Sequence, residues 1–85
     1  MRSPINQVED IRGLKATVMG LGLHGGGLAS ARFLAENGAI VTVTDMKSEH
    51  DLAESVAALG SLPIRYVLGR HDLADFISAD LVIKN

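Results

Sequence analysis

Short apolar runs recur along this chain, and each predicts a buried β-strand. The run over residues 40–44 is β-branched at every position, which favours a strand over a helix. The run over residues 15–19 leads straight into Gly20, and Pro63 stands at the entrance of a third run. The predicted strands therefore cover residues 15–19, 40–44, 64–68 and 81–83.

Between these runs, the apolar residues take up helical spacing. From Leu28 to Asn37 they fall on one face, and Gly38 follows as a stop. Ser48, with an acid three residues later, predicts the start of a second helix that ends at Gly60. A short third helix is expected after a cap at Asp72, and another at the amino terminus, with Ser3 as its cap and Pro4 first in the helix.

The resulting order is β-α-β-α-β-α-β, which predicts an α/β fold. We expect a Rossmann-like parallel sheet with helices on both faces and right-handed connections. The apolar strands fit burial on both faces of the sheet. Residues 1–85 are expected to form a single domain, and because the chain ends with its fourth strand we expect a truncated amino-terminal domain.

Composition narrows the classes of function. Apolar residues make up 47% of the chain and the formal net charge is −2, which argues against nucleic acid or an anionic membrane as a partner. The chain has no cysteine, which excludes disulfides and thiolate metal sites. No apolar run approaches a membrane span and the start has no signal-peptide segment, so a cytoplasmic location is expected.

The segment Gly20-Leu21-Gly22-Leu23-His24-Gly25 matches the pattern G-x-G-x-x-G between a predicted strand and a predicted helix. In this pattern the first glycine makes a tight turn and the second lets the backbone approach a diphosphate. The third allows close packing of helix on strand, a role that either Gly25 or Gly27 could fill here. Backbone N–H groups at the helix start, together with the helix dipole, favour an anion.

Asp45 follows the second predicted strand, at the distance of about 20 residues where such folds place an acid. Its carboxylate could accept hydrogen bonds from a ribose hydroxyl or a base N–H, and it would repel the 2′-phosphate of NADP. A glycine-rich turn without a ligand is the alternative interpretation. His24 could donate a hydrogen bond to a phosphate, but its side chain is expected to point to solvent, and His71 is expected to be a surface residue. His50 is expected at a solvated helix start, because local clustering does not supply the converging ligands of a metal site.

Several segments together resemble the amino-terminal domain of the Mur ligases. The similarity runs from about Gly13 to Asn85 and is carried by Met19-Gly20-Leu21-Gly22, residues 28–34, Gly38-Ala39, residues 41–45 and residues 79–85. In that family the domain holds the UDP part of the substrate and not a dinucleotide. The resemblance implies that the diphosphate is bound by Gly20, Gly22, Leu23, His24 and Gly25, and the uracil and ribose by Asp45, Met46 and Lys47. The family often has a polar residue and an Arg after the acid, where this chain has Met46-Lys47.

The resemblance also implies a reaction performed elsewhere. ATP phosphorylates the carboxylate of UDP-N-acetylmuramoyl-L-alanine in a P-loop domain, and the amine of D-glutamate then attacks the acyl phosphate. The pattern G-x-x-x-x-G-K-[ST] is absent from these 85 residues, so ATP and Mg are expected in missing domains. We expect no catalytic residue, no metal and no bound cofactor in this fragment. The D-glutamate-adding member matches best, with the L-alanine-adding member as its nearest rival.

Two other functions share part of the pattern. An NAD-binding half of an oxidoreductase, or of a nucleotide sensor, would use the same glycine loop and Asp45. A receiver-type signalling domain would need acids after the first strand, where this chain has Met19-Gly20. The NAD-binding interpretation therefore stays open, and the receiver interpretation is disfavoured.

Overall fold

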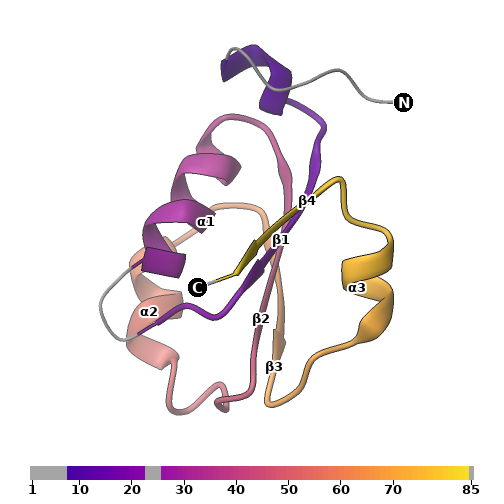
Figure 1. Ribbon diagram of the computed structural model, residues 1–85. Helices are drawn as coiled ribbons and strands as arrows, with labels where there is room; N and C mark the ends of the chain where they lie inside the picture. Colours follow the sequence, from indigo (N-terminus) through magenta and orange to yellow (C-terminus); the bar gives the residue numbers. More distant parts are fainter. Residues whose placement is uncertain (1–7, 23–25, 85) are drawn as a thin grey trace.

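A computed structural model gives the structure of the chain and describes residues 8–22 and 26–84. Its secondary structure follows the predicted alternation of strands and helices (Figure 1). The elements are a 3₁₀ helix (Val8–Ile11), β1 (Lys15–Met19), α1 (Gly26–Glu36), β2 (Ile40–Asp45), α2 (Ala53–Leu59), β3 (Ile64–Leu68), α3 (Leu73–Ile77) and β4 (Leu81–Lys84). The helix expected at Ser3 and Pro4 begins outside the described residues.

The strands form one parallel sheet in the order β3-β2-β1-β4. Val18 in the middle of β1 is in register with Val43 of β2 and with Ile83 of β4. The two helices α1 and α2 cover one face of this sheet, and α3 lies on the other (Figure 1). The predicted α/β fold with helices on both faces is therefore confirmed.

The apolar core lies between the sheet and the α1–α2 layer. Helix α1 buries residues at helical spacing, among them Ala31, Leu34 and Ala35. They meet the valines of the two central strands, which are almost completely buried. The core contains Ile11, Ala16, Val18, Leu21, Ala31, Leu34, Ala35, Ala39, Val41, Val43, Leu52 and Leu59.

The face toward α3 is more polar than the prediction of apolar burial on both faces allows. Thr17 and Thr42 are in register on β1 and β2, and Arg65 continues the row on β3. Asp75 of α3 packs over this row. Its backbone carbonyl accepts a 2.6 Å hydrogen bond from the buried Thr17 hydroxyl, and its carboxylate pairs with Arg65. Because α3 has only five residues, hydrogen bonds replace much of the apolar contact that would otherwise hold a helix to a sheet.

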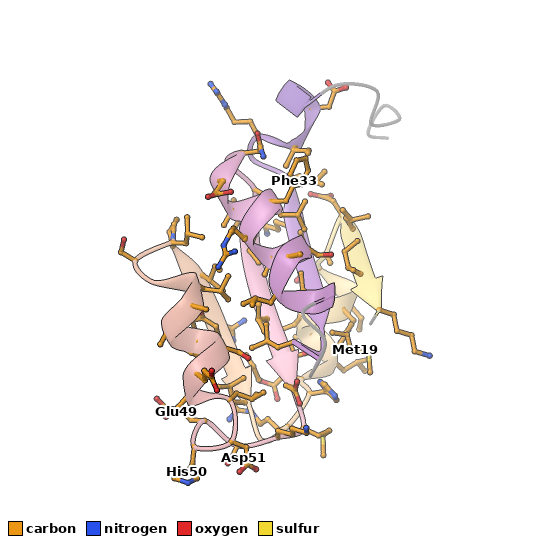
Figure 2. The ribbon with its side chains drawn as sticks, turned by 90° about the vertical axis from the view of Figure 1, so that its left-hand side faces the viewer. Met19, Phe33, Glu49, His50 and Asp51 are labelled. Carbon is orange, nitrogen blue, oxygen red and sulfur yellow. The ribbon has the colours of Figure 1, made fainter. Side chains whose placement is uncertain are left out.

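Two predicted helix starts need correction. Helix α2 begins at Ala53 and not at Ser48. The hydroxyl of Ser48 accepts a hydrogen bond from the backbone N–H of Asp51 at 3.2 Å, which closes a turn before the helix. Figure 2 shows Glu49, His50 and Asp51 on this turn. Asp72 does occupy the cap position of α3, but without a side-chain cap bond, since its carboxylate accepts from Arg70 instead.

Candidate functional site

The carboxyl ends of β1 and β2 lie side by side and position the glycine turn. Met19 is in register with Thr44, so Gly20, the first residue after β1, lies beside Asp45, the last residue of β2. The backbone N–H of Gly20 donates to the carbonyl of Thr44 at 2.7 Å. Gly20 and Gly22 have φ angles of 92° and 74°, in the left-handed region that residues with a Cβ rarely adopt. These angles turn the chain sharply away from β1.

The carboxylate of Asp45 joins this turn to the one after β2. Its Oδ2 accepts a hydrogen bond from the backbone N–H of Leu21 at 3.0 Å, and its Oδ1 accepts from that of Lys47 at 2.8 Å. An ionised carboxylate has about four lone-pair sites, so both oxygens can accept a further hydrogen bond from a ligand.

Gly27 is where α1 packs against the glycine turn. A Cβ on Gly27 would lie 1.9 Å from the carbonyl oxygen of Gly20 and 2.8 Å from the Cα of Leu21. The next residue, Leu28, donates its backbone N–H to the Leu21 carbonyl at 3.2 Å. Of the two glycines proposed for close helix–strand packing, Gly27 is therefore in such contact, and Gly25 lies outside the described residues.

A cavity of about 480 Å³ opens beside the glycine turn. One wall consists of the turn, α1 and the end of β2, and the other consists of α2 and the turn before it. The lining residues are Gly20, Gly22, Leu28, Asp45, Lys47, Asp51, Leu52, Glu54, Ser55 and Ala58. The part that belongs to α2 was not among the sites predicted from the sequence. Its signal was present as the polar face of the second predicted helix, opposite Leu52 and Leu59.

Charge is distributed unevenly around this cavity. Asp51 and Glu54 place carboxylates on the α2 side, and Asp45 adds another at the end of β2. Lys47 is a cation on the same lining. The acids on the α2 side suit a neutral group with hydrogen-bond donors, whereas the glycine turn and the start of α1 suit an anion.

The family model for the Mur ligase MurD-like N-terminal domain matches residues 14–85. The chain belongs to this family.

Curated relatives of this Mur ligase domain agree in name. A UDP-N-acetylmuramoylalanine--D-glutamate ligase of Borreliella burgdorferi (strain ZS7) is 51% identical over 80 residues, which are 92% of this chain and 18% of the relative. Ligases of the same name from Roseiflexus sp. (strain RS-1) and Treponema pallidum (strain Nichols) are 55% and 50% identical, over 88% of this chain in both cases and 16% and 14% of the relatives. The chain thus spans less than a fifth of the length of these relatives. No solved structure matches it.

Within the Mur ligase domain, the structure brings together four of the residues predicted for the site. Gly20, Gly22, Asp45 and Lys47 line the same cavity. Met46 is 64% exposed and is not among the lining residues. The other predicted residues, Leu23, His24 and Gly25, lie outside the described residues.

The turn after β3 is attached to the same end of the domain. Gly69 donates its backbone N–H to the carbonyls of Asp45 and Lys47, both at 2.8 Å. His71, predicted as a surface residue, is half-buried, and its Nδ1 forms a 2.9 Å hydrogen bond with the hydroxyl of the buried Thr44. His50 is exposed, as predicted.

The described part of the Mur ligase domain contains neither a metal-binding cluster nor a helix that could span a membrane. Among residues 8–22 and 26–84, His, Asp and Glu side chains do not gather in threes in a way that could hold a metal ion. No helix within these ranges has the length and apolar character to cross a bilayer.

Proposed function

We propose that this chain binds the UDP part of UDP-N-acetylmuramoyl-L-alanine in a ligase that adds D-glutamate to that substrate. The observation that carries the proposal is the cavity between the glycine turn and α2, in a chain about half identical to ligases of that name. In this proposal, residues 1–85 are one substrate-binding domain of a longer cytoplasmic enzyme.

The diphosphate is assigned to the glycine turn. Gly20 and Gly22 have no side chain that would keep a ligand away from the backbone, and α1 begins at Gly26, shortly after them. Backbone N–H groups at a helix start bind phosphate without needing Lys or Arg. Leu23, His24 and Gly25 would supply such donors, and Lys47 adds a positive charge on the same cavity.

The nucleoside is assigned to the end of β2 and to the α2 wall. The oxygens of Asp45 keep acceptor capacity beyond their bonds to Leu21 and Lys47, which suits the uracil N3–H or a ribose hydroxyl. Met46, which is exposed next to Asp45, would cover the base from outside the cavity. Asp51 and Glu54, the acids on the α2 side, favour neutral ribose and uracil here over a second phosphate group.

The chemical step is assigned to other parts of the longer enzyme. The chain has no G-x-x-x-x-G-K-[ST] segment, so phosphorylation of the substrate carboxylate by ATP and Mg would take place in another domain. D-glutamate would bind and attack the acyl phosphate there. The role of this chain is to hold the UDP end, so that the binding energy of a remote group helps to position the reacting carboxylate.

Backbone amide NMR would test the proposal by titrating the ¹⁵N-labelled chain with UDP-N-acetylmuramoyl-L-alanine and, separately, with NADH. We expect the UDP compound to shift the amides of Gly22, Gly27, Asp45 and Lys47, with little change at the amino ends of the strands. NADH should leave these amides unchanged. Shifts with NADH and none with the UDP compound would overturn the proposal in favour of an NAD-binding domain.

A further inference from the structure

Arg32 links the two helices on either side of the cavity. It lies on α1, and its Nη2 donates a 2.8 Å hydrogen bond to the backbone carbonyl of Ala58, in the last turn of α2. Ala58 lines the cavity from the α2 side, and Leu28, one helical turn before Arg32, lines it from the α1 side. The hydrogen bond therefore joins the two walls one turn away from Leu28.

Helix α2 is short and rests on the apolar core through Leu59 and the partly buried Val56. It has seven residues, and Leu59 is the one that it buries. The carbonyl groups in the last turn of a helix have no partner within the helix and carry its negative partial charge. A guanidinium group that binds one of these carbonyls gives it a partner and places a positive charge near the negative end of the helix, and here it joins the end of α2 to α1.

We propose that Arg32 is a positioning residue for the nucleoside end of the site, which holds the α2 wall at the distance that uridine requires. The inference rests on the proposed UDP-binding function. It predicts a division between the two ends of the ligand. The diphosphate contacts the glycine turn, which Asp45 and Gly27 hold, whereas the nucleoside contacts the wall that Arg32 holds.

Two substitutions separate the hydrogen bond from the packing of the side chain. Arg32→Met keeps an unbranched apolar stem and removes the donors, and Arg32→Lys restores a cationic donor. Titration calorimetry with UDP and with inorganic pyrophosphate would measure the two ends of the ligand separately. We expect Arg32→Met to weaken UDP binding by about three- to tenfold, within the range of a typical intramolecular hydrogen bond, since this one is solvent-exposed. Pyrophosphate binding should change by less than about twofold, and Arg32→Lys should recover part of the UDP affinity.

Hydrogen exchange provides a readout that needs no ligand. Amides of α2 should exchange faster in Arg32→Met, and amides of β1 and β2 should not. Arg12→Met is a matched control, because Arg12 is exposed and packs beside Gly38, away from the cavity lining, and its loss changes the net charge equally.

The outcomes distinguish failure of the positioning role of Arg32 from failure of the proposed UDP-binding function. An equal loss of affinity for UDP and pyrophosphate, or the same loss in Arg12→Met, would overturn the positioning role. So would unchanged exchange in α2 together with unchanged UDP binding. If the unsubstituted chain bound neither compound, the proposed UDP-binding function would be contradicted, and the role of Arg32 at that site with it.

Discussion

The Asp45 carboxylate lies 3.0 Å from the backbone nitrogen of Leu21, a residue 24 positions earlier in the chain. This bond, with the one from Lys47, ties the turn after β1 to the turn after β2. The acid expected to contact a ribose or a base therefore also holds the glycine turn in place. Its two roles are compatible because the carboxylate has more acceptor sites than these two amides use.

Substitution of Asp45 by Asn should destabilise the chain even without ligand. The Asn side chain keeps one acceptor oxygen but turns an NH₂ group toward the other backbone N–H. We expect a loss of about 1–3 kcal/mol in the free energy of unfolding, as for a partly buried amide left without its acceptor. Urea denaturation would measure it. Asp51→Asn is the control, since Asp51 is exposed on the same cavity and its loss should stay within about 0.5 kcal/mol. Equal stability of Asp45→Asn and the unsubstituted chain would contradict the role of Asp45 in holding the glycine turn.

Gly27→Ala should be more damaging than a change at a glycine with free space. The added Cβ would lie 1.9 Å from the Gly20 carbonyl oxygen, so α1 must move away from the turn. We expect a loss of at least about 2 kcal/mol in the free energy of unfolding, typical of overpacking at a tight contact. Gly60→Ala has nothing within 4 Å of its Cβ and a φ of 59°, and its loss should be about 1 kcal/mol. The same denaturation experiment compares the two, and a smaller effect at Gly27 would show that the helix can shift freely.

The strands were predictable from the sequence because their local chemistry and their tertiary environment agree. Residues 15–19 and 64–68 are strands with the predicted bounds, and the β-branched run from Ile40 continues by one residue to Asp45. The glycine pattern also predicted one wall of the cavity. A tight turn and a close helix contact both require glycine, so this part of the site is visible in the local sequence.

The start of α2 and the α2 wall were not predictable in the same way. A Ser hydroxyl that accepts a backbone N–H three residues later is compatible with a helix cap and with an isolated turn, and Ser48 forms the turn. That Glu54 and Ser55 face the glycine turn depends on how α2 packs against α1, which helical spacing does not determine. The half-buried position of His71 likewise depends on Thr44, 27 residues away.

Thr17→Val should loosen α3 from the sheet. The hydroxyl of Thr17 is buried and donates to the backbone carbonyl of Asp75 at 2.6 Å, and valine fills nearly the same volume without the donor. We expect a loss of about 1–2 kcal/mol and faster amide exchange in α3. Thr42→Val provides the comparison, because Thr42 is half-buried in register with Thr17, and its change should be smaller. Exchange in α3 that is unaffected by Thr17→Val would contradict this account.

Tyr66 should titrate above the ordinary range of a phenol. Burial against the core raises the pKa of Tyr66 above its usual value of 10.0. Because the folded chain holds this proton more tightly than the unfolded chain, the contribution of Tyr66 to stability is present below pH 10.0 and is lost as the pH rises above it. Tyr66 is the single tyrosine of the chain, so tyrosinate absorbance reports on it alone. A midpoint at or below the value of a tyrosine model peptide would contradict the prediction.

The acids of the α2 side should discriminate between positions of a phosphate on the nucleoside. If the diphosphate end contacts the glycine turn, a phosphate on the ribose 3′-oxygen would lie toward Asp51 and Glu54 and be repelled. Glu54→Gln should therefore raise the affinity for uridine 3′-monophosphate by about two- to fivefold relative to uridine 5′-monophosphate, and Asp51→Asn should act in the same direction.

Glu49→Gln is the matched control for these substitutions. Glu49 lies on the same turn as Asp51 but is not among the residues that line the cavity (Figure 2). The Glu49→Gln substitution removes the same charge at a position away from the cavity lining. We therefore expect it to leave the ratio of the two affinities unchanged. The effect of Glu54→Gln should shrink as salt is added, because screening weakens repulsion between partly exposed charges. A ratio that rises equally in Glu49→Gln would mean that the net charge of the chain decides the preference. A ratio that does not change in any variant would place the nucleoside away from α2.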